Sequence, residues 1–123
     1  MPAAAHVLVE FPARPEFLRL ARMAAADIGS RAGFDYEEIE DLRIAVSELC
    51  AMISGDEEAA VALSFELSDD AVRVEGSSRA HDSVPLADDL ELAQGLVAAV
   101  VDEHEVTRDD EGARFWLVKR RRR

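Results

Sequence analysis

The sequence predicts a two-layer α/β sandwich, in which three helices cover one face of a mixed, mostly antiparallel sheet. Two observations predict this fold. Apolar residues change from helical to alternating spacing in the order strand, helix, helix, strand, strand, helix, strand, strand. The chain has 123 residues, 49% of them hydrophobic, which is enough for one core and too few for two ordinary domains. We expect residues 1–118 to form this single domain and residues 119–123 to form a basic C-terminal tail.

The first half of the chain predicts one strand and two helices. Residues alternate over His6–Phe11, as in a strand, and apolar residues recur at helical spacing over Glu16–Ser30. The expected apolar stripe of this helix is Phe17, Leu20, Ala21, Ala24 and Ile28. Asp35 and Glu38 have the spacing of a capping box, so a second helix begins there and ends at Gly55. Its apolar face is the most regular in the chain and consists of Ile39, Leu42, Val46, Leu49 and Ile53.

The second half predicts two hairpins separated by a loop and a helix. Val61–Leu67 alternates, a Ser-Asp-Asp turn follows, and Val72 and Val74 return as the second strand. Residues 76–89 show no period and are expected to form a loop, and Leu90–Val101 is apolar at helical spacing. The last hairpin is expected from Glu103–Thr107 and Ala113–Val118.

Charge and composition narrow the classes of partner. The net charge is −12, and because the last five residues are all basic, residues 1–118 carry −17. Such a body repels phosphate backbones, which argues against direct nucleic-acid binding and favours a basic protein partner. The single cysteine, Cys50, excludes an intramolecular disulfide and a multi-thiolate zinc site, and the three histidines are scattered. No apolar run is long enough to cross a membrane, so a cytoplasmic location is expected.

Glu48 is the residue that stands out on the second helix. It lies within Ile44–Ile53, a run that is otherwise almost wholly apolar or small. An unpaired buried carboxylate is costly, so Glu48 lies at the rim of the helix–sheet interface or lines a pocket. An ordinary solvated position on the helix is the alternative.

Three stretches of the first half carry a resemblance to a known family. They are Pro12-Ala13-Arg14-Pro15-Glu16, Ser30-Arg31-Ala32-Gly33 and the run from Tyr36 to Cys50, YEEIEDLRIAVSELC. Over residues 12–50 the chain resembles the bacterial anti-sigma factors that are also protein-serine kinases. These proteins belong to the ATPase superfamily that includes histidine kinases, gyrase and Hsp90. The resemblance therefore implies the histidine kinase-like ATPase fold. Beyond residue 50 it rests on element order, Gly95-Leu96 and Asp102-Glu103.

The resemblance implies a protein that sequesters a sigma factor, usually as a homodimer, and that an anti-anti-sigma protein displaces. The kinase form phosphorylates that antagonist on a serine with Mg-ATP. Glu48 matches the family's catalytic carboxylate, which orients or deprotonates the acceptor hydroxyl. Arg22 has the family's spacing for an arginine that contacts both partners, and we expect Arg22 and Arg19, on the same helix, to bind the partner. A solvated arginine on a polar helix face is the alternative for Arg22.

The nucleotide motifs of the family are incomplete in this sequence. Met52 stands where the family has the asparagine that holds magnesium, and a thioether is a poor ligand for that hard cation. Glu75 and Gly76 stand where an Asp-x-Gly-x-Gly box is expected, and of the paired glycines of the third box Ala93 replaces the first and Gly95 remains. The sequence therefore favours an anti-sigma factor with weak or lost ATP binding and no cofactor. The alternatives are an active serine kinase that uses Mg-ATP, and a partner-switching adaptor whose target is not a sigma factor.

Overall fold

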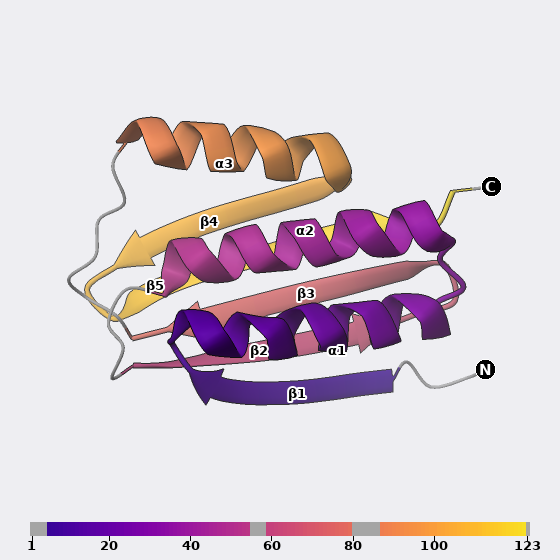
Figure 1. Ribbon diagram of the computed structural model, residues 1–123, viewed down its shortest axis with the longest axis horizontal. Helices are drawn as coiled ribbons and strands as arrows, with labels where there is room; N and C mark the ends of the chain where they lie inside the picture. The colour runs from indigo at the N-terminus through magenta and orange to yellow at the C-terminus, as the bar shows by residue number, and fades with distance from the viewer. Residues whose placement is uncertain (1–4, 55–58, 80–86, 123) are drawn as a thin grey trace.

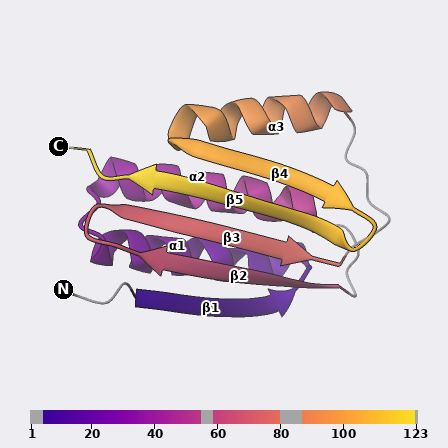
Figure 2. The same cartoon turned by 180° about the vertical axis from the view of Figure 1, so that it is seen from behind.

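The computed structural model describes residues 5–54, 59–79 and 87–122, and the side chains of 87–90 are not among the parts described. Its elements are β1 (Ala5–Pro12), a 3-10 turn (Pro15–Phe17), α1 (Leu18–Arg31), α2 (Tyr36–Ile53), β2 (Ala60–Leu67), β3 (Ala71–Ser78), α3 (Ala87–Val100), β4 (Glu103–Asp109) and β5 (Gly112–Arg120) (Figure 1). The strand order in the sheet is β1-β2-β3-β5-β4, and every neighbouring pair is antiparallel (Figure 2). The predicted element order is confirmed.

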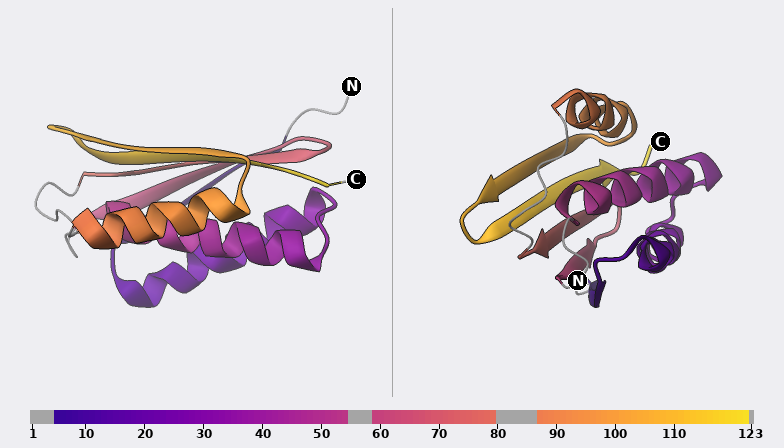
Figure 3. Two further views of the ribbon diagram at one scale, coloured as in Figure 1. Left: turned by 90° about the horizontal axis from the view of Figure 1, so that it is seen from above. Right: turned by 60° about the vertical axis from the view of Figure 1, so that its left-hand side comes forward.

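The three helices all lie on one face of the sheet, as the view from above shows (Figure 3). The strands alternate accordingly: Val61, Leu63 and Phe65 of β2 are fully buried against the helices, whereas Ala62 and Ser64 between them are not. No helix of the described residues lies on the other face of the sheet (Figure 3). The predicted α/β sandwich with helices on one face is therefore confirmed, and its described strand pairs are all antiparallel rather than mixed.

Helix α2 lies over the middle of the sheet, between α1 and α3 (Figure 1). The predicted capping box begins it: the Glu38 amide donates to Asp35 Oδ1 at 2.8 Å, and the Asp35 amide donates to Glu38 Oε1 at 2.8 Å. Of its predicted apolar face, Leu42, Val46, Leu49 and Ile53 are buried and Ile39 is half-buried. Because the apolar face of α2 is buried in the core, the helix cannot rotate, and Glu48 is held in one orientation relative to the sheet.

Helix α1 differs from the prediction at its start and in its apolar stripe. The segment predicted to begin the helix at Glu16 forms a 3-10 turn, and the α-helix begins at Leu18. Its buried residues are Ala21, Ala25, Ile28 and Gly29. The expected inclusion of Leu20 is wrong, because its side chain is 44% exposed. The small residues of the stripe bring α1 close to its neighbours, and Leu20 lies on the flank of that contact.

The second half differs at three boundaries. Strand β3 continues to Ser78, so Gly76 lies inside a strand and not at the start of a loop. Helix α3 begins at Ala87, three residues before the prediction, and residues 80–86 of the predicted loop lie outside the described residues. Strand β5 extends to Arg120, so the first two residues of the predicted tail lie in the sheet. The Lys119 side chain is buried, and it holds the end of the sheet to the helices.

Candidate functional site

Glu48 lies on the side of α2 that faces α3. Asp41 marks this side, because its carboxylate lies 3.6 Å from Lys119 Nζ, and that ammonium also donates a 2.8 Å hydrogen bond to the carbonyl of Val100 in α3. Glu48 follows Asp41 by seven residues, close to two full helical turns, so the two carboxylates share one side of α2. Glu48 is half-buried on this side of α2, which agrees with the expectation of a position at the rim of the helix–sheet interface or in a pocket.

The carboxylate of Glu48 has no hydrogen bond or ion pair with any residue in the described part of the chain. Each of the other carboxylates on this side of α2 has a partner: Asp41 pairs with Lys119, and Glu37 lies 3.6 Å from Arg122. A half-buried carboxylate without a partner remains available to accept a hydrogen bond from a group outside the domain.

Met52 lies one helical turn beyond Glu48, and its side chain is buried. Its carbonyl oxygen accepts a 2.9 Å hydrogen bond from Nη2 of Arg108, which comes from the end of β4. A positive charge at this point is favourable, because the last carbonyls of a helix are unsatisfied and carry partial negative charge. The end of α2 is therefore satisfied by a guanidinium of the protein, next to a thioether that offers no hard oxygen.

Arg22 comes from α1 and reaches α2 at Ser47. Its Nη1 donates a 3.2 Å hydrogen bond to the hydroxyl of Ser47, and the side chain is half-buried. The interpretation as an ordinary solvated arginine is therefore not supported. Arg19, one turn earlier on α1, is exposed. The structure thus brings Arg22 to Ser47, the residue before Glu48, on the side of α2 that faces α1.

Glu75 lies on the face of the sheet opposite to the helices. It is exposed and pairs in register with Ser64 and Trp116, and these three residues line a hollow of about 650 Å³ on the helix-free face. Its carboxylate lies 3.3 Å from the guanidinium of Arg73, whose cation lies 4.9 Å from the centre of the Trp116 ring. The sheet therefore separates Glu75 from Glu48.

Gly76, the next residue, faces the helices but is covered. A β-carbon placed there would lie 2.2 Å from Cε2 of Phe115, so the Phe115 ring fills the space above it. On α3, Ala93 is half-buried against the core, whereas Gly95 is exposed and a β-carbon there would meet nothing within 4 Å. The positions predicted to form a degenerate ATP site therefore do not form one cluster in the described structure. They are Glu48, Met52, Glu75, Gly76, Ala93 and Gly95.

The Cys50 thiol is a further group with possible chemistry. Burial raises the pKa of the Cys50 thiol to about 12, so it is protonated near neutral pH and is not a nucleophile. Among residues 5–54, 59–79 and 87–122, no group of three or more His, Cys, Asp or Glu side chains is arranged to hold a metal ion. Within the same residues, no helix is long and apolar enough to cross a membrane.

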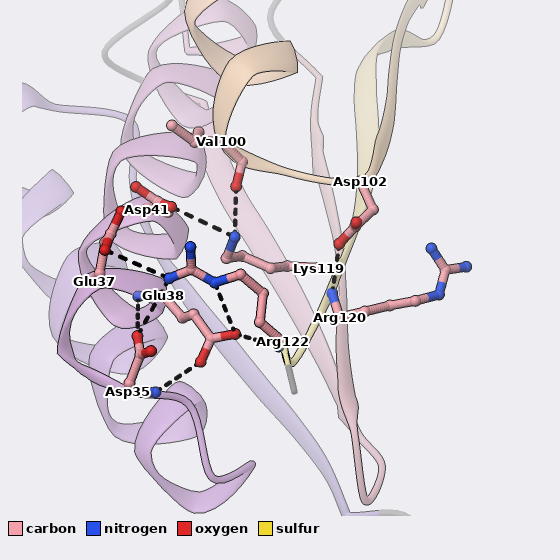
Figure 4. A network of polar contacts seen from close by, with 9 residues as sticks. All are labelled: Asp35, Glu37, Glu38, Asp41, Val100, Asp102, Lys119, Arg120 and Arg122. Carbon is pink, nitrogen blue, oxygen red and sulfur yellow. Dashed lines mark hydrogen bonds and ion pairs between the residues drawn. The ribbon is translucent and has the colours of Figure 1, made fainter.

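Sequence reasoning missed the polar network at the start of α2, where Lys119 and Arg122 contact three acidic residues of α2 and Asp35, the residue before it (Figure 4). The capping box indicated why Glu38 lies at a helix start. It gave no sign that Glu38 is only 2% exposed or that its second oxygen accepts from the Arg122 amide, 84 residues away. Only the folded sheet brings these residues together.

Comparison with known proteins agrees with this architecture. The profile of the histidine kinase-like ATPase domain matches residues 11–119, and the chain therefore belongs to that family. The chain is also similar to proteins named serine-protein kinase RsbW. The protein from Listeria innocua serovar 6a is 37% identical over 73 residues, which are 55% of this chain and 46% of the relative. The protein from Bacillus pumilus is 50% identical over 42 residues, 34% of this chain and 26% of the relative.

The protein of the same name from Bacillus subtilis strain 168 is 44% identical over 45 residues, 37% of this chain and 28% of the relative. The chain thus spans about half the length, or less, of the curated relatives that it matches.

Proposed function

We propose that this chain is an anti-sigma factor that sequesters a sigma factor, that an anti-anti-sigma protein displaces it, and that it binds nucleotide weakly or not at all. Membership of the histidine kinase-like ATPase family and the similarity to RsbW proteins support the class. The observation that carries the proposal is on α2. Among the described residues the Glu48 carboxylate has no partner, Arg22 is held at the preceding Ser47, and the position one turn after Glu48 holds a buried methionine.

The described residues do not fit a magnesium–nucleotide complex of the kind that the family implies. Mg²⁺ requires hard oxygen ligands in near-octahedral geometry, and the Met52 side chain supplies only a buried thioether. The carboxylate that would serve the adenine, Glu75, lies on the far side of the sheet, and Phe115 covers Gly76. We therefore assign the surface around Glu48 a role in protein contact.

The surface around Glu48 has the properties of a docking site for a basic protein. The body of the chain is strongly acidic, and residues 1–118 carry −17, which attracts a basic partner at long range. Arg22 is held in place by Ser47, so it loses little side-chain freedom when a partner binds. We also propose that the chain forms a homodimer. Each dimer would then carry two copies of Arg22 and of Glu48.

The direct test is capture of purified sigma factors and candidate anti-anti-sigma proteins by the full chain. We expect one sigma factor to bind and one antagonist to displace it. Arg22→Ala should weaken both complexes at least about tenfold, as expected for loss of a partly buried charged contact. Arg31→Ala is the matched control, because Arg31 is exposed on the same helix and pairs only with Asp27 in the described structure. Failure to bind any sigma factor would contradict the proposal.

An active serine kinase is the second candidate, and the free carboxylate of Glu48 is the observation that favours it. A carboxylate without a partner can accept the proton of a serine hydroxyl, which is the role of a general base. Incubation with labelled ATP, magnesium and an anti-anti-sigma protein distinguishes the two candidates. Phosphate transfer that Glu48→Gln abolishes would establish the kinase. No transfer by the wild type, together with intact sigma binding, is what the first proposal predicts.

A further inference from the structure

The segment Lys119–Arg122, which we call the C-terminal strap, contacts the sheet and the helices at several points. The Arg121 amide donates to the carbonyl of Asp70 at 2.6 Å, in the turn between β2 and β3. The Arg121 guanidinium lies against Gly33, since a β-carbon there would be 2.7 Å from Nη1. The strap therefore crosses from the end of β5 to the connection between α1 and α2, as Figure 4 shows for its contacts with α2.

The inner end of the strap is firmly held. The Lys119 side chain is 8% exposed, its Nζ donates to the Val100 carbonyl at 2.8 Å, and it lies 3.6 Å from Asp41 Oδ2. A buried ammonium that lost these partners would be uncompensated, so release of this end is strongly unfavourable. Lys119 thus ties the end of α3 and the side of α2 to the sheet.

The outer end of the strap is held weakly. The Arg122 guanidinium lies 3.6 Å from carboxylate oxygens of Asp35, Glu37 and Glu38, and the side chain is 54% exposed. At this separation the contacts are ion pairs without hydrogen bonds, and the two with the exposed Asp35 and Glu37 contribute little to stability and weaken with salt. The backbone of Arg122 adds one hydrogen bond, from its amide to Glu38 Oε2.

Glu38 is the group that the outer end covers. Its side chain is only 2% exposed, although it is charged and lies in the first turn of a helix. Its Oε1 belongs to the capping box, whereas its Oε2 is bound only by Arg122 among the described residues. Release of Arg122 would uncover Oε2 to water and leave the capping box intact. It would also remove the cation that Asp35, Glu37 and Glu38 share among the described residues.

We propose that the strap is an autoinhibitory contact with a fixed inner end, Lys119, and a releasable outer end, Arg122. Arg122 occupies the place that an arginine of a basic partner segment takes when it binds to the first turn of α2. The partner chemistry follows from the occupant, because carboxylates arranged around a planar guanidinium suit arginine better than lysine. The identity of the partner rests on the proposed function. The release of Arg122 does not, and it can be measured on the purified protein without a partner.

Hydrogen exchange of the ¹⁵N-labelled protein tests the release. Arg122→Ala should lower the protection of the Glu38 and Ile39 amides about fivefold, because the outer end opens more often. The matched control is Arg120→Ala, since Arg120 belongs to the same segment but its side chain pairs with Glu103, away from α2. It should change these amides less than twofold. Equal protection in the wild type and Arg122→Ala would overturn the proposal.

Binding of a blocked tri-arginine peptide, followed by amide shifts, tests the displacement. The Arg122→Ala protein should bind it at least about threefold more tightly than the wild type, with shifts centred on Asp35, Glu37 and Glu38, and should bind blocked tri-lysine less well. Equal affinity for the peptide in the two proteins would overturn the autoinhibitory role. Both results are independent of whether a sigma factor binds, so failure here and failure of the proposed function are distinguishable.

Discussion

The ring of Phe115 on β5 lies over the α-carbon of Gly76, its register partner on β3, so closely that a β-carbon at Gly76 would be 2.2 Å from Cε2. Phe115 is only 3% exposed and belongs to the core, where side chains are closely packed. We therefore expect Gly76→Ala to destabilise the domain by about 1–3 kcal/mol, the usual cost of overpacking. Urea denaturation of the variant and the wild type measures it, and an unchanged midpoint would contradict the packing.

Gly95 provides the matched control for that substitution. It lies in α3, it is exposed, and a β-carbon there meets nothing within 4 Å. Glycine in a helix costs about 0.5–1 kcal/mol relative to alanine, so Gly95→Ala should stabilise the domain by that amount. The two glycine-to-alanine changes are thus predicted to have opposite signs in the same denaturation experiment. A loss of stability at Gly95 would mean that another group approaches this glycine closely.

Lys119→Met tests the inner end of the strap. Methionine keeps most of the aliphatic length but removes the ammonium, which leaves the Val100 carbonyl without its donor and Asp41 without its cation. We expect a loss of about 1–3 kcal/mol in the free energy of unfolding. Arg120→Ala, which removes an exposed ion pair with Glu103, should change it by less than about 0.5 kcal/mol. Equal effects would show that Lys119 is an ordinary surface cation.

Cys50 makes stability depend on alkaline pH. Burial raises the pKa of its thiol from 9.0 to about 12, so the folded state holds this proton more tightly than the unfolded state does. The resulting stabilisation is fully present below pH 9 and is lost as the pH rises from 9 towards 12. The wild type should therefore lose more stability over that range than Cys50→Ala, in denaturant titrations at fixed pH. If the free energy of unfolding fell equally with pH in the two proteins, the Cys50 thiol would not be buried as described.

The same thiol should be unreactive in the folded protein near neutral pH. At pH 8 a group with a pKa of about 12 is almost wholly protonated, and only the thiolate reacts with disulfide reagents. We expect no reaction with a coloured disulfide reagent in buffer and one thiol per chain after addition of denaturant. Fast reaction in buffer would place Cys50 at the surface.

The sequence was most informative where a single segment determines its own structure. The capping box of Asp35 and Glu38 and the spacing of Leu42, Val46 and Leu49 predicted α2 because both patterns are local. For Glu48 the same pattern left a rim position, a pocket position and a solvated position open, and the folded chain shows it half-buried. The resemblance over residues 12–50 gave the family correctly for the same reason.

The features that were missed depend on contacts between distant segments. Gly76 in isolation predicts a loop, and only the register of β3 with β5 shows that it makes room for Phe115. The basic run at the end predicts a solvated tail, and only the closed sheet brings Lys119 to Asp41 and Arg122 to Glu38. Glu75 was placed with the nucleotide motifs by sequence order, whereas the two-residue period of the strand puts it on the opposite face.

We propose that the surface around Glu48 contacts proteins and does not hold magnesium–nucleotide. Isothermal titration calorimetry of the full chain with ATP and with ADP, each with and without magnesium, measures nucleotide binding. We expect no binding tighter than about millimolar and no effect of magnesium, because the Met52 side chain supplies no ligand for that cation. Micromolar binding that requires magnesium, and that Glu48→Gln weakens, would contradict it.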